Sequence, residues 1–275
     1  MTESKEPSEE TLRAGILAIG DEVLDGLVLD TNSNWIEIHL APLGVEMNRL
    51  VSVRDNLVEI GRALKFLMET CNLVITSGGL GPTHDDMTLK AVAQAFSRNL
   101  VEDQKALSMV KRQYRELYER GIVNSPEITE SRRKMACIPK GSAALNNTVG
   151  GAPGVMLEID NVTIFCLPGV PSELKMIFKR SIVPWIQKRS TSAFYERIVE
   201  FKMRDESVFA PIIDIVMKMH PGVYIKSMPR IYGTSHVLKV WVSSRGSDKV
   251  TVTKIVEDAI RSICHETGLE AESGR

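Results

Sequence analysis

Strand and helix patterns alternate along the N-terminal part of the chain, and this alternation restricts the possible folds more than any other feature of the sequence. Short apolar runs typical of buried strands occupy Ala14–Ile19, Val45–Val53 and Leu73–Ile75. Between them, Trp35–Leu40 and Leu57–Met68 carry apolar residues at helical spacing. Such alternation predicts right-handed βαβ units and a parallel sheet, whose ligands bind outside the carboxyl ends of the strands. The sequence therefore indicates an α/β fold.

A glycine-rich turn follows the third predicted strand, where the chain reads Ser77-Gly78-Gly79-Leu80-Gly81-Pro82-Thr83-His84-Asp85-Asp86. Gly78, Gly79 and Gly81 can adopt positive φ and leave no Cβ between the backbone N–H groups and a ligand, which suits a phosphate or a carboxylate. In the alternative interpretation, the glycines serve only the shape of the turn. The spacing matches neither a Walker-type loop nor a Rossmann dinucleotide turn.

Two adjacent carboxylates, Asp85 and Asp86, close this turn. Either of them can cap a helix predicted from about Met87 to Ser97, just as Thr31 or Asn32 can cap the helix before the second strand. Two carboxylates would repel a bare phosphate. We therefore expect a divalent cation such as Mg²⁺ or Mn²⁺ between the carboxylates and the substrate phosphates.

The composition describes a globular chain without a strong overall charge. Its 275 residues are 43% hydrophobic, and 34 Lys and Arg face 35 Asp and Glu, so no global field favours nucleic acid or an anionic membrane. The acidic N-terminus and the short apolar runs predict neither a signal peptide nor a membrane span, and we expect a cytoplasmic protein. The scattered cysteines and histidines predict packed thiols and no zinc site. His84 is expected to be a solvated loop side chain rather than a catalytic one.

The next part of the chain predicts a long helix and a second glycine-rich loop. Residues Glu102–Gly121 carry apolar side chains at helical intervals, which favours an amphipathic helix. The loop Asn147–Gly154 then precedes a predicted hairpin of Val155–Ile159 and Val162–Leu167. After the hairpin comes the motif Pro168–Glu173, in which Pro171 or Ser172 begins a helix. These loops either line a small-molecule pocket or are merely connections.

The sequence predicts three segments with different roles. Residues 1–11 are expected to be a disordered leader, residues 12–189 an α/β domain, and residues 190–275 a small α+β domain that begins after a polar stretch. The pattern of the last segment is β-α-β-β-α, with predicted elements at Phe194–Met203, Glu206–Met219, Val223–Met228, His236–Val242 and Asp248–His265.

With these motifs assembled, the chain resembles the molybdopterin-binding-domain superfamily and, within it, the N-terminal part of the competence/damage-inducible CinA proteins. Four motifs carry the resemblance, namely Gly20–Gly26 with Asp30–Asn32, Thr76–Thr88, Asn147–Gly154 and Pro168–Glu173. Leu80 departs from the Gly-Thr-Gly turn of the relatives that make molybdenum cofactor. The resemblance implies a three-layer fold, with a mostly parallel sheet flanked by helices, followed by a small α+β domain.

The resemblance also implies an activity, namely hydrolysis of a nucleotide pyrophosphate such as ADP-ribose or FAD with a divalent metal (Mg²⁺, Mn²⁺ or Co²⁺). On this basis Asp85, Asp86 and Glu22 are the candidate catalytic residues, and Asp85 and Asp86 are the candidate metal ligands. The candidate substrate-binding residues are Gly78, Gly79, Gly81, Thr83, Asp30, Asn32, Asn147, Gly151 and Gly154, of which Asp30 and Asn32 are expected to hold the ribose or base. A metal and backbone donors can neutralise a pyrophosphate for attack by water.

Two other functions are compatible with the same residues. A molybdopterin-binding protein of molybdenum cofactor biosynthesis would use the pocket for a pterin phosphate, and a non-catalytic module would bind a nucleotide without turnover. In each case we expect a small-molecule nucleotide or pterin phosphate as partner, with no nucleic acid and no membrane. The family resemblance implies a homo-oligomer, with a dimer favoured.

Overall fold

The chain divides into two compact units. The computed structural model describes residues 11–203, 206–228 and 237–273. One unit comprises Met1–Leu40 and Val45–Arg189, and the other comprises Ala41–Gly44 and Ser190–Arg275. The division after Arg189 falls at the predicted domain boundary, although the short segment Ala41–Gly44, with a 3-10 turn at Ala41–Leu43, groups with the C-terminal unit. The predicted leader lies outside the described residues except for Thr11.

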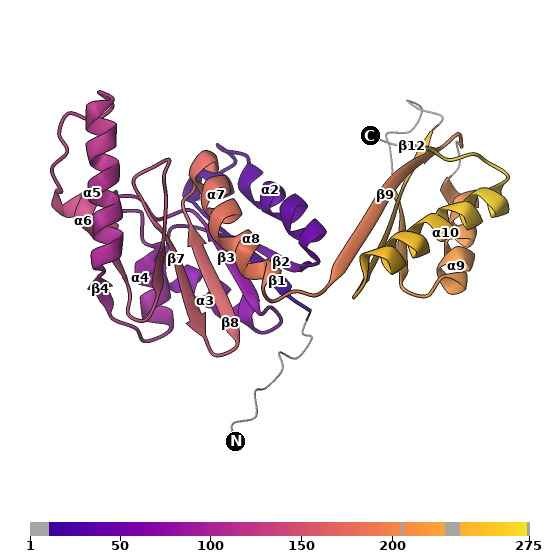
Figure 1. Cartoon of the computed structure of the whole chain (residues 1–275), viewed down its shortest axis with the longest axis horizontal. Coiled ribbons are helices and arrows are strands. Elements are labelled where there is room, and N and C mark those ends of the chain that lie inside the picture. Colours follow the sequence, from indigo (N-terminus) through magenta and orange to yellow (C-terminus); the bar gives the residue numbers. More distant parts are fainter. Residues whose placement is uncertain (1–10, 204–205, 229–236, 274–275) are drawn as a thin grey trace, which may run out of the picture. The chain divides into compact units, whose positions relative to one another are not determined.

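A six-stranded, mostly parallel sheet forms the centre of the N-terminal unit (Figure 1). Its order is β2-β1-β3-β8-β7-β6, with bounds β1 Arg13–Ile19, β2 Glu46–Val53, β3 Leu73–Ser77, β6 Ala143–Leu145, β7 Gly154–Ile159 and β8 Val162–Leu167. The strands β2, β1, β3 and β8 are parallel, whereas β7 runs antiparallel to β8 and β6 antiparallel to β7. The predicted parallel sheet and hairpin are confirmed.

Helices cover both faces of this sheet and give it three layers. Their bounds are α1 Asp21–Leu24, α2 Thr31–Leu40, α3 Leu57–Met68, α4 Thr88–Ala95, α5 Gln104–Glu119, α6 Glu130–Lys134, α7 Pro171–Ile177 and α8 Val183–Gln187, with a π-helical segment Phe178–Ile182 between the last two. Successive side chains of a strand point to opposite faces. Leu17 and Val74 therefore share one core with α3, α4 and α5, while Phe165 meets Trp185 of α8 edge-on, with ring centroids 5.4 Å apart.

Three short strands of this unit have no signal in the sequence pattern. Besides β6, these are β4 Leu100–Glu102 and β5 Cys137–Pro139, which pair antiparallel as a separate ribbon. Each is only three residues long, which is too short for an alternation of apolar and polar side chains to be recognised. Among the described residues, no helix combines the length and apolar content needed to cross a bilayer.

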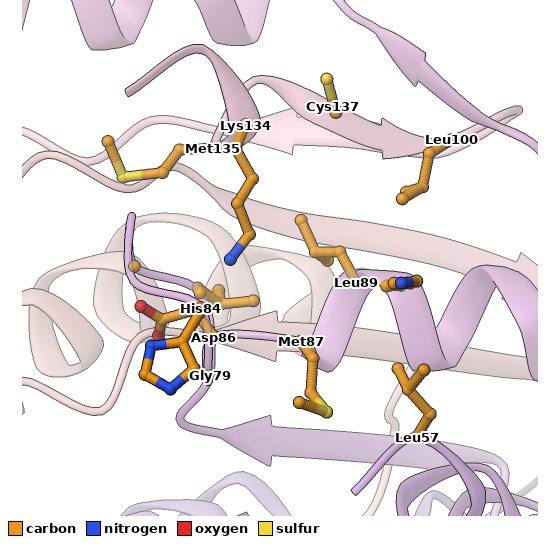
Figure 2. A pocket seen from close by; sticks show the side chains of 13 residues that line it. Leu57, Gly79, His84, Asp86, Met87, Leu89, Leu100, Lys134, Met135 and Cys137 are labelled. Atoms are coloured by element: carbon orange, nitrogen blue, oxygen red, sulfur yellow. The ribbon is translucent and has the colours of Figure 1, made fainter. Parts of the chain in front are cut away.

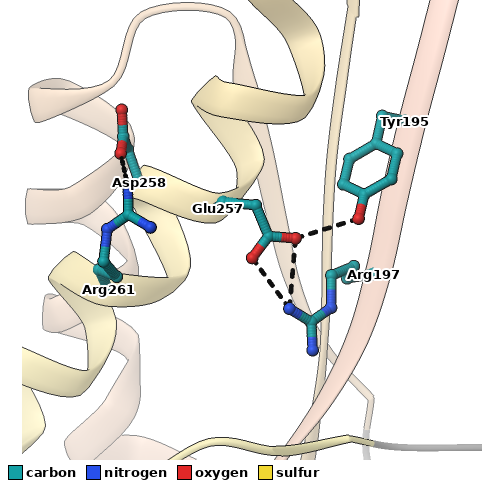
Figure 3. Close-up of polar contacts among 5 residues, drawn as sticks. All are labelled: Tyr195, Arg197, Glu257, Asp258 and Arg261. Carbon is teal, nitrogen blue, oxygen red and sulfur yellow. Dashed lines mark hydrogen bonds and ion pairs between the residues drawn. The ribbon is translucent and has the colours of Figure 1, made fainter. Parts of the chain in front are cut away.

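The C-terminal unit packs two helices on one antiparallel sheet. Its order is β10-β11-β9-β12, with bounds β9 Ala193–Phe201, β10 Val223–Met228, β11 Leu238–Gly246, β12 Glu272–Ser273, α9 Glu206–Met219 and α10 Lys249–Thr267. Figure 3 shows how Arg197 and Tyr195 of β9 converge on Glu257 of α10, with an Arg197 Nη1 to Glu257 Oε2 distance of 2.9 Å. The predicted β-α-β-β-α order is confirmed; the last strand, β12, was missed, and His236 lies outside the described residues.

Candidate active site

The loops after the four parallel strands meet at one edge of the sheet, because the carboxyl ends of parallel strands lie together. They line a hollow of about 430 Å³, which we call the acidic hollow. Each of these loops contributes at least one carboxylate to it, namely Glu22 after β1, Asp55 after β2, Asp85 and Asp86 after β3, and Glu173 after β8. In the described part of the chain, no lysine, arginine or histidine lines it. These carboxylates repel a polyanionic ligand, and a cation that accompanies the ligand would offset this repulsion.

The glycine turn forms one wall of the acidic hollow. Gly78 and Gly79 have φ values of 112° and 67°, so the turn needs glycine at both positions. The N–H of Gly78 donates to the Leu167 carbonyl oxygen at 3.0 Å. The next three N–H groups, of Gly79, Leu80 and Gly81, donate to no acceptor among the described residues. Consecutive free N–H groups of this kind form an anion-binding concavity.

Neighbouring side chains leave no room for a Cβ atom at two of the glycines of the turn. A Cβ on Gly79 would lie 2.2 Å from Thr88 Oγ1, and a Cβ on Gly81 would lie 2.6 Å from Asp86 Oδ2. Thr88 Oγ1 in turn donates to the Gly78 carbonyl oxygen at 2.9 Å. The glycines therefore serve the shape of the turn, as the alternative interpretation proposes. The N–H groups of Gly79 and Gly81 are free for a ligand, whereas that of Gly78 is not.

The predicted capping of α4 by Asp85 or Asp86 is wrong. Met87 occupies the N-cap position, and no side chain caps this helix. Asp86 instead accepts hydrogen bonds from Thr83 N at 2.9 Å and Thr83 Oγ1 at 2.6 Å, which closes the loop on itself. The pKa of Asp85 is lowered, first by a hydrogen bond with the Thr83 side chain and second by a hydrogen bond with its own backbone amide. Thr83, a predicted substrate-binding residue, therefore organises the two carboxylates and does not line the acidic hollow.

Asp55 is a site residue that the sequence interpretation missed. Its Oδ2 accepts from Asp21 N at 3.1 Å, which joins the loop after β2 to the loop after β1. Burial raises the pKa of Asp55, its backbone hydrogen bond with Asp21 lowers it, and repulsion from Asp21, Glu22 and Asp85 raises it further. Asp55 lies two residues after a predicted strand, and this position was the sequence signal that could have identified it as a site residue.

Asp30 and Asn32 were predicted to hold the ribose or base, but neither of them lines the acidic hollow. Asp30 Oδ1 accepts from Ser33 N at 2.9 Å and so caps α2, which corrects the predicted cap at Thr31 or Asn32. Asn32 is only 8% exposed. Its Nδ2 donates to Ser77 Oγ at 3.0 Å and to the Gly169 carbonyl oxygen at 2.7 Å, which fastens two of the site loops together.

The second glycine-rich loop positions Glu173 in the acidic hollow. The buried Asn147 donates to Glu173 Oε2 at 2.5 Å and accepts from the N–H groups of Val149 and Gly150, each at 3.0 Å. A Cβ on Gly150 would lie 1.9 Å from the Glu173 carboxyl carbon. Burial raises the pKa of Glu173, and the Asn147 hydrogen bond partly opposes this. Asn147 thus acts through Glu173.

The two glycines of this loop that were predicted to bind substrate differ in position. Gly151 lines the acidic hollow, where a Cβ would lie 3.1 Å from the Tyr114 ring. Gly154 is buried as the first residue of β7, with Ile177 against it, and does not line the hollow. A Cβ on Gly154 would lie 3.1 Å from Ile177 Cγ2, so a larger side chain would press on α7.

The carboxylates supply the kind of oxygen donors that Mg²⁺ and Mn²⁺ prefer. No three histidine, cysteine or carboxylate groups of residues 11–203, 206–228 and 237–273 form a cluster that could hold a metal ion by themselves. Mg²⁺ is commonly held by one or two carboxylates together with waters and substrate phosphates. Besides burial, the negative charges of Glu22 and Asp85 help to raise the pKa of Asp55, and a bound cation would oppose that effect.

The chain is an α/β protein with a mostly parallel sheet, helices on both faces and a carboxylate-lined hollow at the carboxyl ends of the strands. In α/β proteins this edge of the sheet is where small ligands commonly bind. Residues 15–188 match the family described as "Probable molybdopterin binding domain", and the chain belongs to this family. The expected resemblance is therefore confirmed.

Relatives and a solved structure agree with this assignment. The protein TK1472 of Thermococcus kodakarensis is 36% identical over 249 residues, which cover 90% of this chain and 98% of the relative. A protein of Caldivirga maquilingensis is 38% identical over 254 residues, which cover 92% and 95% of the two chains. The crystal structure of CinA from Thermoplasma acidophilum, described as a protein with unknown function, is 35% identical with a TM-score of 0.57, and the match covers 64% of this chain and 98% of that one.

Proposed function

We propose that the N-terminal unit hydrolyses the pyrophosphate bond of a nucleotide such as ADP-ribose with the help of a divalent cation. The observation that carries this proposal is the pairing, within one hollow, of three free backbone N–H groups with carboxylates from four loops. The N–H groups suit phosphate oxygens, and the carboxylates suit the cation that a polyphosphate brings. FAD contains the same bond and is a second candidate substrate.

The residues that line the hollow have different roles in the proposed reaction. Gly79, Leu80 and Gly81 bind phosphate oxygens through their N–H groups, while Asp55 and Asp85 would hold the cation. When bound, a divalent cation neutralises the developing phosphate charge and lowers the pKa of water. Asp86 keeps the turn closed through Thr83.

Glu173 lines the same hollow as the glycine turn and suits the role of proton acceptor. In hydrolysis, a water oxygen bonds to one phosphorus, the bridging P–O bond breaks, and the water proton passes to a base. ADP-ribose would yield AMP and ribose 5-phosphate. A base is most effective when its pKa approaches the working pH, and burial moves the pKa of Glu173 in that direction.

The test is a hydrolysis assay with the full chain. ADP-ribose is incubated with Mg²⁺, Mn²⁺ or Co²⁺, and AMP and ribose 5-phosphate are separated by ion-exchange chromatography. We expect both products in equal amounts, none after chelation, and none with Asp86→Ala. Asp214→Asn, at an exposed position of α9, is the matched control. Binding without turnover in all three metals would overturn the hydrolase and support the non-catalytic module.

A second candidate function follows from the family match itself. The description of the family favours a molybdopterin ligand, whose phosphate could use the same N–H groups. Leu80 stands where relatives that make molybdenum cofactor usually have threonine, which is why we place this function second. Adenylyl transfer from ATP to molybdopterin, in the absence of ADP-ribose hydrolysis, would reverse the order.

A further inference from the structure

A second hollow lies against the same glycine turn, and the proposed hydrolysis does not use it. Its volume is about 240 Å³, and we call it the apolar hollow (Figure 2). It shares part of its wall with the acidic hollow, namely Gly79, Leu80, Gly81, Asp86 and Met135. A ligand held at the turn can therefore extend into both.

Apolar side chains form the inside of this hollow. Leu80, Leu89 and Met135 are buried at 4%, 9% and 3% exposure and make the floor. Leu57 of α3 and Leu100 of β4 enter from opposite sides, as Figure 2 shows. An apolar ligand surface binds favourably in an open cavity of this kind, because water leaves both the ligand and the cavity wall.

The rim of the apolar hollow is basic, in contrast to the acidic hollow. Lys90, Lys134 and His84 line it and are exposed. In Figure 2, Lys134 extends toward the turn, where its Nζ donates to the Thr83 carbonyl oxygen. Among the described residues, Asp86 is the one carboxylate that lines the apolar hollow, and it already accepts two hydrogen bonds from Thr83. The rim thus favours an anionic group beside an apolar one.

We infer that the apolar hollow binds the planar heteroaromatic ring of a nucleotide whose phosphates lie at the glycine turn. This inference rests on the proposed function for the placement of the phosphates. A nucleobase is a flat ring with apolar faces, and methionines such as Met87 and Met135 adapt to such a shape. The basic rim receives the phosphate next to the nucleoside, and the acidic hollow receives the other one with its cation. The substrate class is then a nucleoside diphosphate derivative, held across the turn by its two chemically different halves.

Binding of the two reaction products tests the inference without any need for turnover. AMP contains ring and phosphate, whereas ribose 5-phosphate lacks the ring. We expect wild-type protein with Mg²⁺ to bind AMP at least about 10-fold more tightly than ribose 5-phosphate in isothermal titration. Leu100→Glu, at a position that is 38% exposed, should weaken AMP about 10-fold and leave ribose 5-phosphate unchanged. Leu57→Gln tests the opposite wall and should act in the same direction.

Leu50→Glu is the matched control, because Leu50 is 49% exposed on β2 and lines neither hollow. Equal affinity of the wild type for AMP and ribose 5-phosphate would overturn the inference, as would AMP binding that neither Leu100→Glu nor Leu57→Gln changes. AMP binding that depends on Leu100 without hydrolysis of ADP-ribose would sink only the proposed function. Hydrolysis with no dependence on either leucine would sink only the ring site. The same titration with FMN in place of AMP tests whether the site accepts a larger ring.

Discussion

The acidic hollow and the apolar hollow share the glycine turn, Asp86 and Met135 but differ in the rest of their lining. Loops after parallel strands line the first and bring carboxylates from four directions. Helices α3 and α4 and the ribbon β4-β5 line much of the second and bring leucines, with lysines at the rim. Because the glycine turn carries almost no side chains, its two sides take their character from their surroundings. The contrast teaches that one turn can position two halves of a ligand that need opposite environments.

The largest expected effect comes from neutralising the acidic side. Asp85→Asn removes an exposed carboxylate whose pKa is lowered in the fold, so wild-type protein has it ionised at neutral pH. We expect the kcat for ADP-ribose hydrolysis to fall on the order of 100-fold, while AMP affinity changes far less. Steady-state kinetics at saturating Mg²⁺ measure the first and titration the second. An equal loss in both would mean that the two hollows are not separate in function.

The second prediction disturbs the shared wall. Gly79→Ala places a Cβ at φ 67°, within 2.2 Å of Thr88 Oγ1. Gly121→Ala is a close control, because its φ is 68° and nothing lies within 4 Å of its Cβ. The control should cost about 1–2 kcal/mol of unfolding free energy for the left-handed conformation alone, and Gly79→Ala about 1–3 kcal/mol more. Urea denaturation measures both, and equal costs would mean that the turn relaxes freely.

The sequence pattern was sufficient for the five longer strands of the central sheet, because each is a run of neighbouring residues, but not for the three-residue β6. Ala14–Ile19 and Leu73–Ile75 are continuous apolar runs, and both lie inside observed strands. The choice between neighbouring polar residues was not local. Asn32 rather than Asp30 is buried because its partners Ser77 and Gly169 come from elsewhere in the chain. No spacing rule within the motif could have separated their roles.

Glu173 illustrates the same limit at the candidate site. Its motif was recognised, but its place in the hollow depends on Asn147 and Gly150, which lie on another loop. Asp55 was overlooked because it stands next to Asn56, which caps α3 and made the segment look like an ordinary helix start. In both residues, position in the fold rather than residue type creates the candidate role.

A smaller effect is expected from the rim of the apolar hollow. Lys134→Met removes the charge but keeps an apolar stem, so the hollow itself stays lined. We expect AMP affinity to fall about 2- to 5-fold, as for one exposed charge, and the remaining affinity to depend less on salt. Lys111→Met, on the exposed surface of α5, is the control. Titrations at low and high salt decide it, and an unchanged salt dependence would place the phosphate away from the rim.

The smallest expected effect is on stability, and it comes from the ionisation of Glu173 as the pH changes. The pKa of Glu173 is raised by burial, so the folded chain keeps this proton to a higher pH than the unfolded chain, which releases it at about 4.3. Wild-type stability therefore falls as the pH rises from that value through the raised pKa. Glu173→Gln has no charge to desolvate and can still accept from Asn147.

We expect Glu173→Gln to raise the melting temperature by on the order of 1–2 °C at pH 7 and to have no advantage at pH 4. The exposed Glu127→Gln should show neither effect. Differential scanning calorimetry at a series of pH values measures the difference between the variants. An advantage for Glu173→Gln that is equal at both pH values would show that ionisation of this carboxyl is not its cause, and Glu173 would then no longer qualify as the proton acceptor in the acidic hollow.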